Sequence, residues 1–220
     1  MLFKFSNPNL ALFVLLISLA SLEVNSKEVT DCQPCEFLVG KSGHVFDFIF
    51  YFDEGGNKRK LKKIDVKHNQ RDLQSLTIEG EEEVEGPYDF DVVNVQNASM
   101  IYLVTSNGAS GNMYADYWIY DNDFIGVSDS QGKSEPFHLL GNFPYLTYDP
   151  DRNVFKSHVS GGHGGRSFEK SEYTLENNEL KLVYLESQSY DHKADIYLHT
   201  IKKLNSNRLV VVVNEKLNLK

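Results

Sequence analysis

Cysteine, positive charge and helical periodicity are all scarce in this sequence of 220 residues. Only two cysteines are present, which excludes a disulfide-dense miniprotein and a zinc site built from four cysteines. Acidic residues outnumber lysine and arginine by 31 to 22, so the formal net charge is −9. A general nucleic-acid-binding protein is therefore disfavoured, because such proteins neutralise phosphates with lysine and arginine.

Recognisable catalytic motifs are also missing. The seven histidines form neither a His-x-His nor a His-Glu-x-x-His set, so zinc catalysis has no support. No Gly-x-Ser-x-Gly nucleophile motif occurs, and neither of the two glycine-rich segments, residues 106–112 and 160–166, is followed by the Lys-Ser or Lys-Thr of a phosphate-binding loop. Acidic residues are common on any protein surface and do not by themselves indicate catalytic carboxylates. We expect that the protein is not an enzyme.

The N-terminus has the pattern of a secretory signal peptide. Lys4 precedes an apolar run at Leu10–Ala20, and small residues follow at cleavage spacing, ending at Ala20 or at Ser26. The run is shorter than the roughly 20 residues that a membrane-spanning helix needs. We expect residues 1–26 to be a signal peptide and residues 27–220 to form one domain that is periplasmic or secreted, with no membrane contact after cleavage.

Export places Cys32 and Cys35, in the motif Cys-Gln-Pro-Cys, in an oxidising compartment. A thioredoxin-like redox pair needs a helix after the first cysteine, whereas a phenylalanine-rich strand pattern follows here. We therefore predict a structural Cys32–Cys35 disulfide.

The remaining sequence has the short aromatic and β-branched runs, bounded by Gly, Pro, Asn or Asp, that are typical of strands. With no helical segment between them, these runs predict an all-β fold of short antiparallel strands and hairpins. The expected strands are Val45–Phe52, Lys60–His68, Leu73–Ile78, Met100–Ser106, Ala115–Asp121, Leu146–Tyr148, Val154–Val159, Glu169–Leu175, Glu179–Ser187, Ala194–Lys202 and Arg208–Asn214.

Two glycine-rich segments form a weak internal repeat, Ser-x-Gly-x-x-Gly-x-x-aromatic, with starts 54 residues apart. The first runs through Ser106, Asn107, Gly108, Ala109, Ser110, Gly111 and Asn112, and the second through Ser160, Gly161, Gly162, His163, Gly164, Gly165 and Arg166. Two interpretations remain open. Each segment is either a tight hairpin turn or a loop that inserts into a partner's cleft, where Ser160, His163 and Arg166 would supply hydrogen-bond donors to carboxylates.

The motifs of residues 88–187, in their order, resemble a family of exported bacterial β proteins. The resemblance rests on Thr105–Asn112 with Tyr117–Asp121, then on Leu146–Pro150, Phe155–Arg166, Tyr173 and Glu179–Val183. The family includes periplasmic inhibitors of invertebrate-type lysozyme and immunity proteins that neutralise peptidoglycan-hydrolase effectors of a bacterium-killing type IV secretion system. It implies a compact, propeller-like antiparallel β fold and inhibition by a loop that enters the hydrolase's active-site cleft.

The resemblance assigns the inhibitory loop to Ser160–Arg166 and a related second loop to Ser106–Asn112. It implies a protein partner, a peptidoglycan hydrolase or lysozyme. The alternative function is an envelope module that binds carbohydrate or calcium and has no protein target.

The calcium-binding segment of many family members, Asp-x-Asn-x-Asp-Gly-x-x-Asp, is not preserved here. Only Asn94 survives in that register, and Val92, Gln96 and Met100 occupy acidic positions. Because calcium needs several oxygen ligands in one loop, we expect no metal cofactor. Asp89, Asp91 and Asn94 are the weak candidates for a regrouped calcium site.

Overall fold

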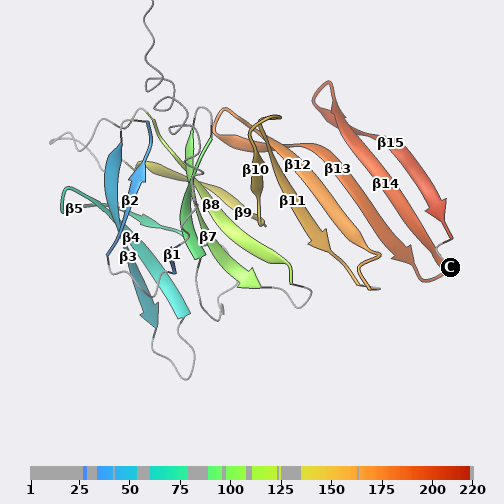
Figure 1. Cartoon of the computed structure of the whole chain (residues 1–220), viewed down its shortest axis with the longest axis horizontal. Helices are drawn as coiled ribbons and strands as arrows, with labels where there is room; N and C mark the ends of the chain where they lie inside the picture. Colours follow the sequence, from blue (N-terminus) through green and yellow to red (C-terminus); the bar gives the residue numbers. More distant parts are fainter. Residues whose placement is uncertain are drawn as a thin grey trace, which may run out of the picture.

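The computed structural model describes residues 27–28, 34–41, 43–53, 60–78, 89–95, 98–107, 111–122, 124, 135–162 and 164–218. These residues form fifteen strands and no helix, and every strand pairing is antiparallel. The all-β prediction is confirmed. Figure 1 shows the strands gathered into three sheets that follow one another along the molecule.

Each sheet is largely a meander, in which neighbouring strands are also neighbours in sequence. The N-terminal sheet contains β2 (Cys35–Val39), β3 (His44–Asp53), β4 (Lys60–His68) and β5 (Arg71–Leu76). The central sheet contains β1 (Lys27–Glu28), β6 (Asp89–Asn94), β7 (Ser99–Asn107), β8 (Met113–Tyr120) and β9 (Phe137–Pro144). The C-terminal sheet contains β10 (Thr147–Asp149), β11 (Val154–Ser160), β12 (Phe168–Glu176), β13 (Glu179–Asp191), β14 (Ile196–Asn205) and β15 (Arg208–Leu217).

All strand ranges expected from the sequence overlap a strand of the structure. The sequence patterns missed β1, β2, β6 and β9. Strand β9 contains Gly141 and ends at Pro144, two residue types that weaken a strand prediction. Its neighbour β8 nevertheless pairs with it from Tyr114 to Tyr120.

The central sheet buries both of its faces, and side-chain alternation along β7 and β8 explains how. Ile101, Leu103, Trp118 and Tyr120 belong to a hydrophobic cluster shared with strands β2–β5. Their neighbours on the opposite face join a second cluster with Phe155 of the C-terminal sheet and with Leu146, which directly precedes that sheet; they are Met100, Tyr102, Val104, Ala115, Tyr117 and Ile119. Strand residues alternate between faces, so a two-sided core requires apolar residues at successive positions. Strands β7 and β8 supply them, with the buried Asp116 of β8 as an exception.

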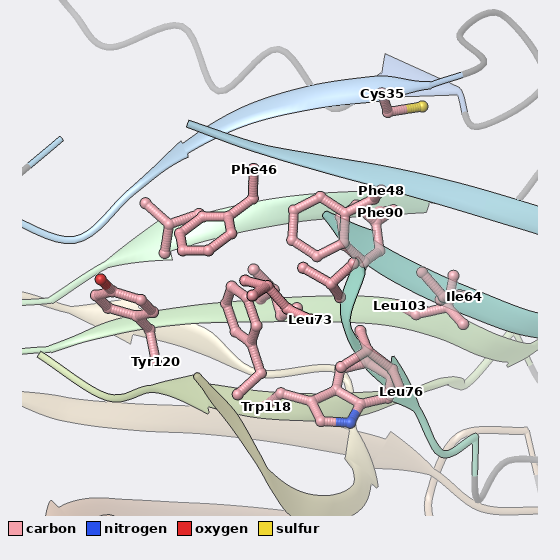
Figure 2. Close-up of a cluster of buried hydrophobic side chains, with 14 of the residues drawn as sticks. Cys35, Phe46, Phe48, Ile64, Leu73, Leu76, Phe90, Leu103, Trp118 and Tyr120 are labelled. Carbon is pink, nitrogen blue, oxygen red and sulfur yellow. The ribbon is translucent and has the colours of Figure 1, made fainter. Parts of the chain in front are cut away.

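The first cluster is dominated by aromatic rings, as Figure 2 shows for Phe46, Phe48, Phe90 and Trp118. The ring centroids of Phe48 and Phe90 are 4.9 Å apart, and those of Phe46 and Phe137 are 5.2 Å apart in an edge-to-face arrangement. Burial of each large apolar side chain contributes roughly 1.5–3 kcal/mol to folding. This cluster therefore holds the N-terminal and central sheets together.

Candidate functional site

The predicted inhibitory loop is the connection between strands β11 and β12. Its base is closed by the backbone N–H of Gly161, which donates to the Ser167 carbonyl over 2.7 Å. A Cβ at position 161 would lie 2.7 Å from the Ser167 Cβ, so only glycine permits this close approach of the two loop ends. The glycine at 161 therefore has a structural role in closing the hairpin.

The tip of the loop faces open space. Gly162, Gly164 and Gly165 are exposed, and a Cβ built on any of them meets no atom within 4 Å. Gly164 and Gly165 have φ values of +66° and +81°, in the left-handed region that glycine adopts without steric cost. The tip is thus a narrow turn with little side-chain bulk. His163, the remaining predicted donor of the tip, lies outside the described residues.

The C-terminal side of the loop is held by the C-terminal sheet. Arg166 is exposed, and its backbone carbonyl accepts a hydrogen bond from Gln188 Nε2 over 2.5 Å. Gln188 lies on β13 directly across from Phe168. The loop end is therefore anchored to a strand whose own position is fixed by two neighbouring strands.

The second glycine-rich loop meets the first at Asn112. Asn112 Nδ2 donates to the Ser160 carbonyl over 2.8 Å, and Asn112 Oδ1 accepts from the Ser160 N–H over 2.7 Å. Gly111, beside it, has a φ of +74° and is exposed. Gly108, Ala109 and Ser110 lie outside the described residues, and Ser106 and Asn107 end strand β7. The two repeated segments therefore occupy equivalent hairpin positions and come together in space.

A groove of about 950 Å³ opens beside this junction. Its floor contains two rows of cross-strand neighbours on the C-terminal sheet. One row is Lys156, Glu172, Tyr184 and Lys203, and the other is His158, Lys170 and Glu186. Gly111, Asn112, Met113 and Tyr145 line it from the central-sheet side.

This groove is not predictable from the sequence. Its lining residues come from segments that are up to 93 positions apart, from Gly111 to Leu204. The only local signal is the alternation of charged and uncharged residues along β11 and β12, and any solvent-facing strand shows the same alternation. The register between strands, which brings the charges into rows, cannot be read from one strand alone.

Ion pairs order the charged side chains of the floor. Arg152 donates from both terminal nitrogens to the two Glu172 carboxylate oxygens, each over 2.7 Å. This bidentate geometry fixes the planes of both groups. Lys156 Nζ lies 2.5 Å from Asp149 Oδ2. The hydrogen bond from Lys156 holds the pKa of the Asp149 carboxyl below its usual value, so this carboxylate stays ionised at neutral pH.

Glu186 is the centre of a second group. Burial acts to raise its pKa, but hydrogen bonds from His199 and Lys170 prevail and lower the pKa below its ordinary value. Lys170 Nζ is 3.4 Å from Glu186 Oε2, and the Tyr184 hydroxyl donates to the same oxygen over 3.2 Å. Lys170 also lies over the Phe168 ring, 4.7 Å from its centroid. Charged side chains and the aromatic rings of Tyr184 and Phe168 thus lie next to each other in this group.

The three weak calcium candidates do not share one site. All lie on β6, where Asp91 pairs with Tyr102 and Asn94 pairs with Ser99. Residues three apart in a strand point to opposite faces, so Asp91 and Asn94 are separated by the sheet. Asn94 Oδ1 accepts from the Ser99 hydroxyl, and burial raises the pKa of Asp91. Among the described residues, no group of three or more His, Cys, Asp or Glu is arranged to hold a metal ion.

The predicted disulfide and signal peptide fall largely outside the described residues. Cys35 is 1% exposed at the start of β2, and no cysteine in the described part of the chain is a free thiol. Cys32 and residues 1–26 are not described, so the Cys32–Cys35 bond and the cleavage site stay predictions. The described residues contain no helix long and apolar enough to cross a membrane.

Comparison with known proteins adds no assignment. The chain matches no family model, no curated protein and no solved structure. Any function of the chain therefore has to be inferred from the loop, the groove and the resemblance of its sequence motifs.

Proposed function

We propose that the protein is a non-catalytic inhibitor or immunity protein, periplasmic or secreted, which blocks the active-site cleft of a peptidoglycan hydrolase such as a lysozyme. The loop Ser160–Arg166 enters the cleft and excludes the glycan. The observation that carries the proposal is the open surroundings of Gly162, Gly164 and Gly165, where no atom lies within 4 Å of an added Cβ. A loop tip with little side-chain bulk can reach deep into a narrow cleft. The propeller-like arrangement implied by the sequence motifs is part of the same proposal.

Rigidity at the loop base supports this function. The two Asn112 hydrogen bonds, the Gly161–Ser167 bond and the Gln188–Arg166 bond hold both ends of the loop. A loop that is ordered before binding loses less conformational entropy on association. The side chains at the tip can therefore be changed without altering the direction of the loop, because the hydrogen bonds at its base set that direction.

Charge complementarity supports a basic target. The chain has a formal net charge of −9, and many lysozymes are basic. Opposite net charges accelerate diffusional encounter and favour the correct orientation. The rate of association should therefore fall as the salt concentration rises.

The test is an inhibition assay with invertebrate-type lysozyme and with any peptidoglycan hydrolase encoded beside the gene. The purified protein should protect peptidoglycan from at least one of these enzymes at micromolar concentration. Gly162→Phe should abolish protection, because the added ring fills the tip that enters the cleft. Glu179→Phe is the matched control, since Glu179 is exposed at the opposite end of the β12–β13 pair.

Both variants should keep the wild-type melting temperature, which shows that the domain remains folded. Absence of protection against every enzyme tested, or equal loss of protection in the two variants, contradicts insertion of this loop.

A further inference from the structure

The groove beside the glycine-rich loops has a charge opposite to that of the whole chain. Four cationic side chains line it, Arg152, Lys156, Lys170 and Lys203, against the two carboxylates of Glu172 and Glu186. With histidine neutral, and with Asp149 included as the ion-pair partner of Lys156, these side chains carry a formal charge of +1, whereas the chain carries −9. A concave surface of one charge sign concentrates ligands of the opposite sign.

One cation of the groove has no counter-ion among the described residues. Lys203 is exposed and forms no ion pair within the part of the chain that the structure describes. The other three are positioned by Glu172, Asp149 and Glu186. Lys203 lies across from Tyr184 on the neighbouring strand, so its ammonium group is available to an anion placed along that row.

The shape and polarity of the groove suit an extended, hydroxyl-rich molecule. The floor crosses from β10 to β14, and four steps between strands of about 4.8 Å give a span of roughly 19 Å. Tyr145 and Tyr184 line the groove, and aromatic rings pack against the apolar faces of sugar rings. The paired carboxylates and ammonium groups offer both acceptors and donors to hydroxyls.

We propose that this groove binds an anionic oligosaccharide whose sugar units carry carboxylates. The cations Lys156, Lys170 and Lys203 would contact the carboxylates, and Tyr184 would pack against a sugar ring. The proposal is independent of loop insertion into a hydrolase, because the groove residues belong to the sheet surface and not to the loop tip.

The test is titration calorimetry of the full-length protein with a hexamer of galacturonic acid, which is carboxylated, and a hexamer of N-acetylglucosamine, which is neutral. We expect the galacturonate hexamer to bind and the neutral hexamer to bind at least about tenfold more weakly, since the neutral sugar lacks the charges that the cations attract. Affinity for the acidic hexamer should fall as NaCl is raised from about 0.05 M to about 0.3 M, because added salt screens exposed charges.

Two charge-reversal variants distinguish binding in the groove from nonspecific attraction of the hexamer to the rest of the protein surface. Lys203→Glu should weaken binding of the acidic hexamer by about tenfold, because attraction is replaced by repulsion. Lys202→Glu makes the same change of net charge on the adjacent residue, which points to the opposite face of β14, and should change affinity less than about twofold.

Three outcomes would overturn the proposal: no binding of the acidic hexamer, equal binding of the two hexamers, or equal effects of the two lysine variants. Inorganic phosphate serves as a small-anion probe. If phosphate displaces the hexamer at comparable concentrations, the groove is a simple anion site and the oligosaccharide assignment is wrong. No hydrolase is present in these experiments, so their failure leaves the inhibitor proposal to its own assay.

Discussion

The Asn112 side chain makes two hydrogen bonds to the backbone of Ser160, one as donor and one as acceptor, 48 positions away in the sequence. These bonds satisfy the N–H and the C=O of the residue that ends β11. The contact joins the two glycine-rich loops and sets the direction in which the predicted inhibitory loop, Ser160–Arg166, leaves the sheet.

Replacement of Asn112 by alanine tests this relationship. Asn112→Ala should lower the free energy of unfolding by about 1–3 kcal/mol, because the partly buried polar groups of Ser160 lose their partners. Denaturant unfolding measures the change, and hydrogen exchange of the Ser160 amide should accelerate. Asn112→Asp keeps the acceptor but places a carboxylate oxygen against the Ser160 carbonyl oxygen, so it should not restore the wild-type stability. Unchanged exchange at Ser160 in the alanine variant would contradict the anchoring role.

Neighbouring glycines of the loop should respond differently to the same substitution. Gly161→Ala should destabilise the domain by about 1–3 kcal/mol, because its Cβ would lie 2.7 Å from the Ser167 Cβ. Gly162→Ala should change stability by less than about 0.5 kcal/mol, since the space around it is open. Thermal unfolding of the two variants provides the comparison. Equal destabilisation would show that the tip packs against the protein.

The connection between the central and C-terminal sheets depends on a buried tyrosine. Tyr117 is 1% exposed, and its hydroxyl accepts the Leu146 N–H over 2.7 Å. Burial raises the pKa of this hydroxyl, so it stays protonated at physiological pH. Tyr117→Phe should lower the free energy of unfolding by about 1–3 kcal/mol, because the buried Leu146 N–H is left without a partner.

Tyr102→Phe is the matched control for the Tyr117 variant. Tyr102 lies on the same face of the central sheet, and its hydroxyl is 3.3 Å from the Tyr145 hydroxyl. A contact of that length is weaker than the 2.7 Å bond of Tyr117, so its loss should destabilise less. A larger effect at Tyr102 than at Tyr117 in urea unfolding would contradict this ranking.

Acid should destabilise the N-terminal sheet through His68. Burial and the nearby His44, whose ring centroid is 5.3 Å away, lower the pKa of His68 below 6.5. The unfolded chain therefore binds a proton at a higher pH than the folded protein does. The contribution of neutral His68 to the free energy of unfolding is fully present above pH 6.5. This contribution decreases as the pH falls from about 6.5 toward the folded-state pKa.

The His68→Phe variant isolates this effect. Phenylalanine fits among Phe46 and Phe124, whose rings already contact His68, and it cannot take up a proton. Between pH 8 and pH 5.5 the free energy of unfolding should decrease less in the variant than in the wild type. Measurements at pH 8, where His68 is neutral in both states, report the packing difference alone. Parallel pH profiles for the two proteins would refute a role for His68.

The sequence by itself determined the β structure and the positions of most hairpins. Aromatic and β-branched runs between turn residues predict strands because side chains of that shape pack well on a pleated surface. The glycine-rich segments marked the hairpins between β7 and β8 and between β11 and β12. Strand β9 was missed because its local composition, with Gly141 and Pro144, opposes a strand. Pairing with β8 and burial of Phe137 in the first hydrophobic cluster stabilise it.

Tertiary structure alone decided which distant residues meet. The approach of Asn112 to Ser160, the two-sided burial of the central sheet and the rows of charge across β11–β14 all depend on strand register and on how the sheets stack. Register is a property of pairs of strands, and stacking is a property of whole faces. Local sequence specifies which side chains of a strand are apolar and which are polar. Which surface each face of a sheet packs against depends on the total apolar area that all the strands bury together.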